Sequence, residues 1–488
     1  MAQFSEQLEK YIKLRKITYT QVAEQVGKDR TLIHHLARGT RKPTSVELIE
    51  KLASVLMLSP EEYEEFFHLG QKARLGEEIY ARRQAIQKML LDISLPEAYP
   101  PLIVTGDKSA SKLPHICESA AQVRVLLKTL IDQESTLPNG YIRFLGQPNQ
   151  NFLLYLIQCA SAVSSLSIQH ILCLDHDPRA STTNIDNFSA IISSLFTIKN
   201  YEAFYFYGTL PTYHSYLSPF PILFLTSTCA LQINIDYTAA IIHTGSAYRL
   251  LNSFFEQSLK HCQPLVYKID ALSQYVNAQS SFMDNIGAGK EDHFFVLVPD
   301  FCCTSFLDQE ILNAHLIKNI PNREMLISAI LNRGQDSLTG LFKCPNVQYY
   351  TKKGVLRFLN TGRFSECPDE FYTPFSPAFR TKILKRSIET AEKSELFQPR
   401  LYDHSTLPFL DTLSVTANTN RVAFCINNKT SQPNFVFLSL QEQSISFAIS
   451  DYFSGLLEYP AVYSKADTLE WMKQALTQYC QENDLELP

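Results

Sequence analysis

The chain has 488 residues, about three times the length of a common domain, so we expect two or three compact units. A composition of 45% hydrophobic and 19% charged residues, with 31 Phe and 24 Tyr, excludes a mainly disordered chain. Only 16 glycines are present, and neither GxGxxG nor GxxxxGK followed by Ser or Thr occurs, which excludes nucleotide-binding loops built on those motifs. The net charge of −5, taken alone, argues against a nucleic-acid partner.

The cellular compartment can be predicted from the 11 cysteines and from the N-terminal residues. No CxxC pair occurs, and free thiols in a reducing cytosol are the simplest interpretation. The N-terminus lacks a basic segment followed by an apolar one, and no uninterrupted apolar run reaches the roughly 18 residues of a membrane span. We therefore expect a soluble, cytoplasmic protein without a membrane partner.

The N-terminal residues, up to about residue 70, predict five helices. Thr18 and Gln21 form a capping-box pair that begins one helix, which ends at Gly27. Asp29 is suited to cap the next helix, which ends at Gly39. Two short helices joined by a tight turn that contains glycine form a helix-turn-helix. The residues that predict the other three helices are Phe4, Leu8, Tyr11 and Ile12 before this pair, and Val46, Ile49, Leu52, Ala53, Leu56 and the cap Ser59 to Glu62 after it.

This series of helices resembles the Xre (Cro/CI-type) helix-turn-helix family over residues 3–68. The residues that carry the resemblance, in order and spacing, are Thr18 to Glu24, Gly27, Ile33, Arg38-Gly39, Pro43, Leu48 to Leu56 and Ser59 to Tyr63. Tyr19 and Ala37 depart from the family pattern, which usually has Gln and Glu there, and this concerns individual contacts rather than the fold. The resemblance implies a transcriptional regulator that binds double-stranded DNA.

The charge distribution supports the same partner without the resemblance. Residues 1–45 hold nine basic and four acidic side chains, which gives this segment a net charge of +5. Because the whole chain has a net charge of −5, residues 46–488 carry −10. Basic residues that neutralise DNA phosphates release counterions, and this release supplies most of the non-specific affinity for DNA. A basic N-terminal segment on an acidic body therefore indicates nucleic acid as the partner.

The resemblance also implies roles for single residues, because the third helix of this family enters the major groove. The side chains expected near base edges are Arg30, Thr31, His34 and His35. Among them Arg30 is best suited to a bidentate contact with guanine. The side chains expected to hold backbone phosphates are Tyr19, Lys28, Arg38, Arg41 and Lys42. The two neighbouring histidines have no third ligand nearby in sequence, so we expect no metal there.

Residues 70–101 predict a helical linker between the helix-turn-helix domain, residues 1–69, and the remainder. The apolar residues at helical spacing are Ile79, Ile86, Met89, Leu90 and Ile93, with Arg82 and Arg83 interrupting them. Two interpretations stay open. The helix either pairs with another helix as a coiled surface or packs on its own domain.

From about residue 102 the pattern changes to alternating helices and apolar strands, which predicts a large mixed α/β body. We expect an α/β domain at 102–270, a mainly helical connecting region at 271–344 and a second α/β domain at 345–488. The expected strands are 141–145, 166–174, 203–207, 222–226, 230–235, 239–242, 294–298, 413–416, 435–440 and 445–449. The expected helices are 117–132, 150–163, 247–260, 305–318, 323–332, 377–392 and 467–481. The whole chain is thus predicted to be multidomain, with an all-α five-helix domain before the α/β body.

A repeated order of segments suggests that the body consists of two related α/β halves. The segment from Pro221 to Asp236, followed by a helix ending near Cys262, matches the segment from Asn434 to Asp451 and a helix ending near Cys480. This arrangement resembles the duplicated halves of phospholipase D-like domains. The catalytic motif of that family, HxK followed by Asp, does not occur. The resemblance therefore implies a body that has the fold without the chemistry.

A polar triplet, Asp175-His176-Asp177, follows the predicted strand that ends at Leu174. Ligands often bind at the carboxyl ends of strands in α/β proteins, and two carboxylates around a histidine suit a divalent ion or acid and base catalysis. A polar loop that turns at Pro178 is the simpler interpretation. We treat the triplet as a candidate ligand site and expect neither a metal nor a cofactor.

These patterns together predict a sequence-specific DNA-binding transcriptional regulator, not an enzyme, whose acidic body dimerises and senses a small-molecule or peptide effector. Dimerisation is expected because one module makes few base contacts, whereas two half-sites a helical turn apart multiply the specificity. Two alternatives stay open. One is a DNA-targeted enzyme or defence effector that uses the helix-turn-helix for targeting or autoregulation, and the other is a protein-interaction scaffold.

Overall fold

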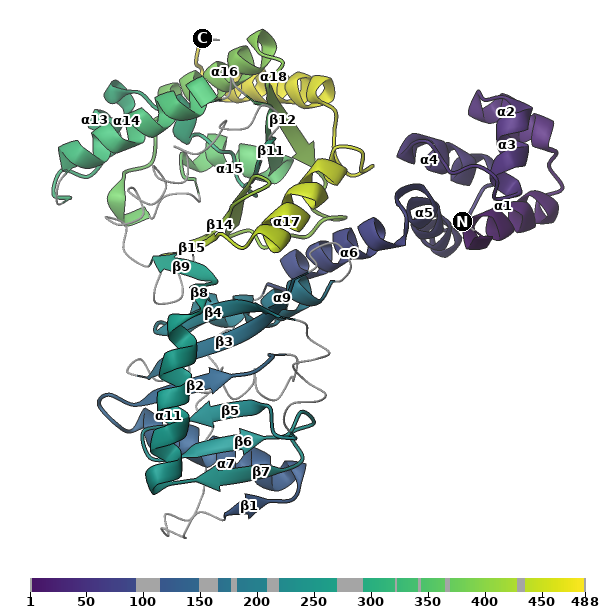
Figure 1. Cartoon of the computed structure of the whole chain (residues 1–488). Helices are drawn as coiled ribbons and strands as arrows, with labels where there is room; N and C mark the ends of the chain where they lie inside the picture. Colours follow the sequence, from purple (N-terminus) through teal and green to yellow (C-terminus); the bar gives the residue numbers. More distant parts are fainter. Residues whose placement is uncertain are drawn as a thin grey trace.

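The computed structural model describes residues 2–93, 115–148, 166–176, 182–208, 219–269, 293–320, 323–340, 344–364, 369–427 and 435–486. Within these ranges a helical N-terminal unit stands beside a larger α/β body, and one helix, α6, connects them (Figure 1). The predicted sequence of a helical region followed by a mixed α/β body is confirmed. No helix in the described ranges is both long and apolar enough to cross a membrane.

The N-terminal unit consists of five helices, as the sequence predicts, but the fifth runs to Leu75, past the predicted boundary at residue 69. These are α1 (Ala2–Leu14), α2 (Tyr19–Val26), α3 (Arg30–Ala37), α4 (Val46–Val55) and α5 (Pro60–Leu75). The Thr18 side chain accepts the N–H of Gln21, whose side chain accepts the N–H of Thr18 in return. Gly27 has a φ of 70° and ends α2 in the left-handed conformation that glycine adopts at least cost.

The linker helix α6 (Glu77–Asp92) follows a bend at Gly76, whose φ is 91°. Its apolar residues Ile86, Met89 and Leu90 are fully buried in the core of the body. The two helices against which α6 packs are α9 (Thr183–Thr197) and α17 (Gln443–Leu456). Helix α6 thus lies within the range 70–101, and its apolar side is buried within its own chain.

The first sheet of the body has eight strands in the order β1-β7-β6-β5-β2-β3-β4-β8. Their bounds are β1 (Ile116–Cys117), β2 (Tyr141–Leu145), β3 (Ser167–Asp175), β4 (Tyr201–Gly208), β5 (Ile222–Leu225), β6 (Ala230–Ile233), β7 (Ala240–His243) and β8 (Gln263–Pro264). Strands β2, β3 and β4 are parallel, and the remaining pairs are antiparallel. Helices α7 (Ala120–Ser135) and α9 contribute to the large core, and α11 (Gly245–Lys260) lies on the opposite face of the sheet.

The second sheet has seven strands in the order β12-β11-β10-β13-β14-β15-β9. Their bounds are β9 (Val266–Ile269), β10 (Phe294–Leu297), β11 (Asn346–Thr351), β12 (Phe397–Tyr402), β13 (Leu413–Ala417), β14 (Val422–Asn427) and β15 (Phe435–Leu440). Its helices, apart from α17, are α13 (Gln309–His315), α14 (Arg323–Gly340), α15 (Lys352–Thr361), α16 (Pro377–Lys393) and α18 (Lys465–Glu482). Helices α15, α16 and α18 share one apolar cluster with strands β11 and β12.

Six strands of each sheet have the same order and the same directions. The order β7-β6-β5-β2-β3-β4 in the first sheet corresponds to β15-β14-β13-β10-β11-β12 in the second. In both, three parallel strands are extended by three antiparallel ones, and a helix follows the last strand in sequence, α11 after β7 and α17 after β15. The sheet order therefore pairs β5 with β13 and β7 with β15.

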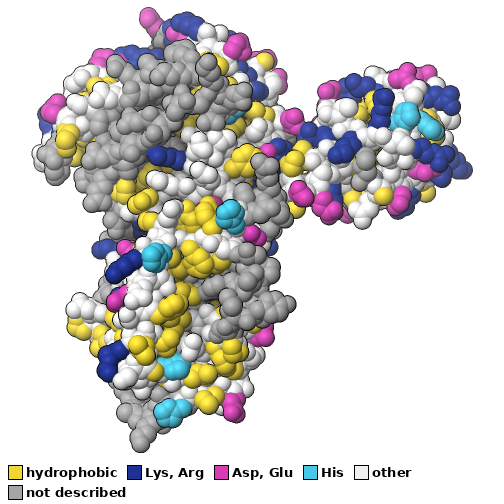
Figure 2. All heavy atoms as spheres, viewed as in Figure 1, with side chains coloured by type: hydrophobic (Ala, Val, Ile, Leu, Met, Phe, Trp, Pro, Cys, Tyr) yellow, Lys and Arg dark blue, Asp and Glu magenta, His cyan; other side chains and the backbone are white. Residues whose placement is uncertain are grey.

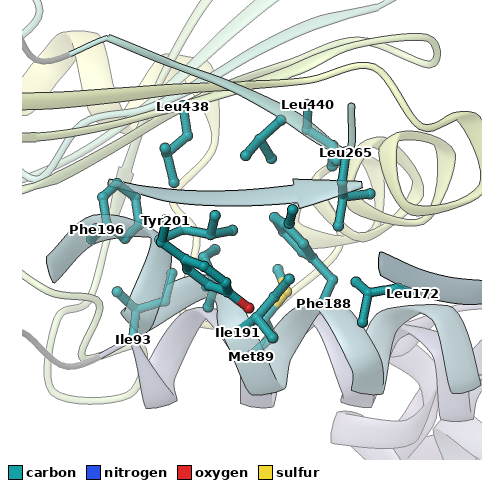
Figure 3. Close-up of a cluster of buried hydrophobic side chains, with 14 of the residues drawn as sticks. Met89, Ile93, Leu172, Phe188, Ile191, Phe196, Tyr201, Leu265, Leu438 and Leu440 are labelled. Atoms are coloured by element: carbon teal, nitrogen blue, oxygen red, sulfur yellow. The ribbon is translucent and has the colours of Figure 1, made fainter. Parts of the chain in front are cut away.

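Helix α9 lies between the two sheets and gives them a common core. Phe188 of α9 is fully buried and has its ring 5.9 Å from that of Phe424 in β14. Figure 3 shows Phe188 and Ile191 of α9 in one buried cluster with Tyr201 of the first sheet and Leu438 and Leu440 of the second. Because Met89 and Ile93 reach the same cluster, the linker helix is built into the contact between the sheets.

Several predictions for the body are wrong or incomplete. Residues 445–449 belong to helix α17 rather than to a strand, because the buried Glu442 side chain caps that helix by accepting the N–H groups of Ser444 and Ile445. The segment match from the sequence is also wrong in register, since it paired β5 with β15. Strands β11, β12 and β14 and helices α9 and α15 were not predicted. The range 271–344, expected to be a mainly helical connecting region, contains β10, a central strand of the second sheet. The predicted helix 150–163 lies outside the described residues.

Candidate nucleic-acid interface

Helix α3 places the four predicted base-reading residues at one surface of the N-terminal unit. Its apolar side is buried, with Ile33 at 0% exposure. The opposite side faces solvent, where Arg30, Thr31 and His34 are exposed and His35 is half-buried. The structure therefore brings these four residues together, one turn apart along the same helix.

Basic residues of the N-terminal unit differ in whether they form ion pairs. Within the described range 2–93, Lys10 and Lys16, on and just after α1, are exposed and form none. Lys13, Arg15 and Lys51 form ion pairs with glutamates at 2.9 Å, 2.9 Å and 2.6 Å. Around α3, within the fully described range 2–93, five exposed basic side chains form no ion pair: Lys28, Arg30, Arg38, Arg41 and Lys42. Exposed cations without acidic partners are what the attraction of phosphates requires. We call these five residues, with Tyr19, Thr31, His34 and His35, the α3 surface.

Figure 2 shows Lys and Arg side chains gathered around the histidines on the part of the N-terminal unit that points away from the body. Two histidines and a tyrosine form an aromatic edge on this surface. The ring centroids of Tyr19 and His34 are 5.7 Å apart, and those of His34 and His35 are 6.0 Å apart. His35 Nδ1 lies 2.7 Å from the hydroxyl of Thr40, so His35 also holds the turn after α3. Tyr19, expected at a phosphate, therefore lies directly beside a residue expected to read bases.

The start of α3 is fixed by Asp29. Its carboxylate accepts the backbone N–H of Thr31 at 2.6 Å. Hydrogen bonds from the Thr31 side chain and backbone lower the pKa of Asp29, so the cap remains charged at neutral pH. Because the cap sets where the helix begins, Asp29 positions Arg30 and Thr31 at the N-terminal end of the α3 surface.

The candidate ligand site in the body lies where the two sheets meet. Asp175 is the last residue of β3, and its backbone exchanges two hydrogen bonds with the Asn184 side chain of α9, at 2.7 Å and 3.1 Å. The His176 ring lies 5.9 Å from that of Tyr207, whose hydroxyl donates to Glu442 at 2.7 Å. Burial and the hydrogen bond to this carboxylate raise the pKa of Tyr207.

The third residue of the predicted triplet, Asp177, lies outside the described residues. Among the described ranges, no group of three or more His, Cys, Asp and Glu side chains is placed to hold a metal ion. Sequence reasoning found Asp175 and His176 but not Glu442, which comes from the other half of the body. No local pattern in the sequence indicates that Glu442 lies near them.

A third cluster joins the linker helix to the body. Arg83 donates to both carboxylate oxygens of Asp451 in α17, each at 3.0 Å, and Arg82 donates to one of them at 3.2 Å. Burial alone would raise the pKa of Asp451, but the hydrogen bonds and charges of Arg83 and Arg82 outweigh it and lower that pKa. We call these three residues the Asp451 cluster. Arg82 and Arg83, which interrupt the apolar pattern of α6 in the sequence, thus attach α6 to the body.

The N-terminal unit matches a known family. A family model described as helix-turn-helix matches residues 8–63, which contain α2 and α3 and the turn between them. Over these residues the N-terminal unit is therefore similar to helix-turn-helix domains of the Xre type. Together with the unpaired cations of the α3 surface, the match supports a DNA-binding regulator in general.

The other comparisons concern the whole chain. No curated protein matches the chain. Among solved structures, the polyphosphate kinase of Porphyromonas gingivalis is 10% identical with a TM-score of 0.22, and the aligned region covers 72% of this chain and 54% of that one. The chain thus spans about half of that structure, and so low a score carries no conclusion about fold or activity.

Proposed function

We propose that this chain is a sequence-specific DNA-binding transcriptional regulator whose body dimerises and senses an effector. The observation that carries the proposal is the group of five exposed basic residues around α3, which form no ion pair within the described range 2–93. Lys13, Arg15 and Lys51 are neutralised by glutamates, whereas Lys10 and Lys16, on and just after α1, are exposed without an ion pair as well. A surface that keeps its positive charge available at a recognition helix is suited to the phosphates and base edges of DNA.

Effector sensing is supported by the connection between the body and the helix-turn-helix unit. The candidate ligand site at Asp175 and His176 is bonded to α9 through Asn184, and α9 packs against α6. Helix α6 continues into the unit through Gly76, beside the edge-on contact of Phe67 with Tyr459 at 6.0 Å. A ligand that displaces α9 would therefore act on α6 and on the orientation of the α3 surface.

We also propose that the body is non-catalytic and is composed of two related halves. Support for related halves comes from the shared order of six strands and from the helix that follows the last strand in each half. Support for the absence of catalysis comes from the sequence, which lacks HxK followed by Asp. Incubation of the purified chain with labelled DNA and divalent metal should leave the DNA intact. DNA cleavage that the Asp175→Ala variant lacks would favour the DNA-targeted enzyme instead.

The roles of the α3 surface are tested by two variants measured on DNA sites selected from a random pool. Arg30→Ala should weaken binding to the preferred site by about 1–3 kcal/mol and relax the preference at one base position. Lys42→Ala should weaken binding to all sequences by a similar factor and reduce the slope of log affinity against log salt by about 1. Lys13→Ala is the matched control, because Lys13 is paired with Glu9 away from α3.

Three outcomes decide the proposal. Uniform losses for both Arg30→Ala and Lys42→Ala would contradict the division between base reading and phosphate contact. A loss with Lys13→Ala as large as that with Lys42→Ala would contradict the α3 surface itself. The absence of any salt-dependent affinity for DNA would favour the protein-interaction scaffold.

A further inference from the structure

The two neighbouring histidines of the α3 surface differ in how their rings are held. His34 is exposed, and its ring contacts those of Tyr19 and His35 without forming a hydrogen bond in the described range 2–93. His35 is half-buried, and its Nδ1 lies 2.7 Å from the hydroxyl oxygen of Thr40. Of the two rings, that of His35 is therefore tied to a second side chain.

The turn after α3 brings Thr40 back to the ring of His35. Gly39 has a φ of 67°, in the left-handed region that favours glycine. A Cβ added at Gly39 would lie 2.9 Å from the hydroxyl oxygen of Ser5 in α1, so the turn also packs closely against that helix. The backbone N–H of Thr40 then donates to the backbone oxygen of His35 at 3.0 Å. The backbone of the turn thus holds Thr40 beside the ring without help from the Thr40 side chain.

The Thr40 hydroxyl has one proton and two acceptors within reach. The backbone oxygen of His35, at 3.2 Å, already accepts the N–H groups of Thr40 at 3.0 Å and Arg41 at 3.3 Å, which matches the two lone pairs of a carbonyl oxygen. Nδ1 of His35, at 2.7 Å, is closer and accepts no other hydrogen bond within the range 2–93. We therefore assign the hydroxyl proton to the bond with Nδ1.

This assignment fixes the chemistry of the other ring nitrogen. A neutral imidazole carries one proton, so an Nδ1 that accepts a hydrogen bond leaves that proton on Nε2. Within the range 2–93, Nε2 of His35 has no hydrogen-bond partner, and the protein does not enclose it. His35 thus presents an N–H donor at the α3 surface, whereas no hydrogen bond selects between the two tautomers of His34.

We propose that Thr40 is a positioning residue that holds His35 as a hydrogen-bond donor, so that His35 excludes cytosine from one position of the DNA site. This inference rests on the proposed function, because it requires α3 to enter the major groove. There guanine offers N7 and O6 as acceptors, adenine N7 and thymine O4, whereas cytosine offers only the donor N4. A donor that faces a donor leaves both groups without a partner. The opposite tautomer of His35 would instead favour the amino groups of cytosine and adenine.

The tautomer is measured without DNA, by ¹⁵N NMR of the full chain labelled at histidine. The variants His34→Ala and His35→Ala identify the signals of the two rings by their loss. At alkaline pH, where imidazoles are neutral, wild-type His35 should have a protonated Nε2 and an unprotonated Nδ1. Thr40→Val removes the hydroxyl at almost the same shape and should increase the share of the other tautomer, whereas Thr40→Ser should not. A protonated Nδ1 in the wild type would overturn the proposal, whether or not Thr40→Val folds.

The effect on recognition is measured on a selected site with each base in turn at each position. The position that His35 reads is the one at which His35→Ala abolishes the base preference. There the wild type should bind cytosine at least about fivefold more weakly than the preferred base. Thr40→Val should lower this discrimination by about 2- to 10-fold, the equivalent of one hydrogen bond, and Thr40→Ser should retain it.

Thr129→Val is the matched control for Thr40→Val. It removes an exposed threonine hydroxyl on α7, which donates to a backbone oxygen at 2.8 Å, and it should discriminate like the wild type. A purely structural Thr40 would make Thr40→Val weaker on all four bases alike, and that result would overturn the positioning role. A preference for cytosine at the position read by His35, or the lack of any such position, would overturn the donor role.

The two measurements separate this inference from the proposed function. If the wild type binds no duplex, the proposed function fails, and the NMR signals still decide whether Thr40 holds the His35 ring in one tautomer. If the wild type binds its selected site but Thr40→Val keeps the full discrimination against cytosine, the role of Thr40 fails alone.

Discussion

The helix-turn-helix unit and the α/β body of this chain are held together by contacts of different range. In the unit, helix ends depend on residues a few positions away, such as Thr18 with Gln21 and Ser59 with Glu62. In the body, the attachment of α6 depends on Arg83 and Asp451, which are 368 residues apart. Local contacts specify where helices begin and end, whereas distant ones specify how the units are placed. The effects of substitutions on stability should therefore differ between the two regions, both in magnitude and in how far they spread through the structure.

The largest effect is expected at the Asp451 cluster. Asp451→Ala leaves two arginines, 13% and 19% exposed, without their shared acidic partner. Removing one partner of such a buried ion pair destabilises a protein by about 3–5 kcal/mol, and the residual exposure here favours the lower end. We expect a lower denaturant midpoint for the full chain and faster proteolysis near Gly76, since α6 would be released from α17.

Glu458→Ala is the control for that variant at the same contact. The Glu458 carboxylate pairs with Arg74 at 2.8 Å and is 55% exposed, so solvent screens this pair, and Arg74, itself 14% exposed, keeps its hydrogen bond to Gln71 when Glu458 is removed. Exposed ion pairs contribute about 0–1 kcal/mol, so this variant should remain close to the wild type. Equal losses for Asp451→Ala and Glu458→Ala would show that the linker helix does not depend on the buried pair.

A smaller and more local effect is expected at the turn between α2 and α3. Gly27 has a φ of 70°, and a Cβ added there meets nothing within 4 Å. Gly27→Ala therefore costs only the conformational penalty of the left-handed region, about 1–2 kcal/mol. Gly27→Asn, which tolerates that region better, should cost less. Hydrogen exchange of α2 and α3 in the full chain measures both. A loss that spreads to the sheets of the body would contradict the local character of the turn.

The same difference in range explains how far the sequence alone could predict this molecule. Caps and apolar spacing predicted all five helices of the helix-turn-helix unit, because each signal lies within a few residues. Strand β11 was missed because its buried residues include the polar Asn346, Gln348 and Thr351, so it does not stand out as an apolar run. Residues 445–449 read as an apolar strand because their helical cap, Glu442, differs from the Ser, Thr, Asp and Asn usual at that position.

The candidate site followed the same rule. Apart from Tyr19 at the start of α2, the residues of the α3 surface lie on α3 and its flanking turns, so their spacing in the sequence was enough to group them. Glu442 contacts Tyr207 and Asp451 contacts Arg83 only because the fold brings them together. No pattern near Glu442 or Asp451 in the sequence indicates these partners. Prediction from the sequence thus succeeded for contacts made within one helix and failed for contacts made between the halves.

The smallest effect is expected from acid at the cap of α3. Hydrogen bonds from the Thr31 side chain and backbone lower the pKa of Asp29 below its ordinary 3.8, so the folded state favours the charged carboxylate. A lowered pKa contributes stability that is present above the ordinary value and is lost as the pH falls through the folded-state value. The protection of the α3 amides against hydrogen exchange, relative to the intrinsic exchange rate at each pH, should therefore fall in the wild type below a pH of about 4. Asn is an equally good cap without a charge, so in Asp29→Asn the ratio of wild-type to variant exchange rates should rise only in that acid range. A constant ratio across the whole range would show that Asp29 caps α3 through its shape alone, as a neutral residue does.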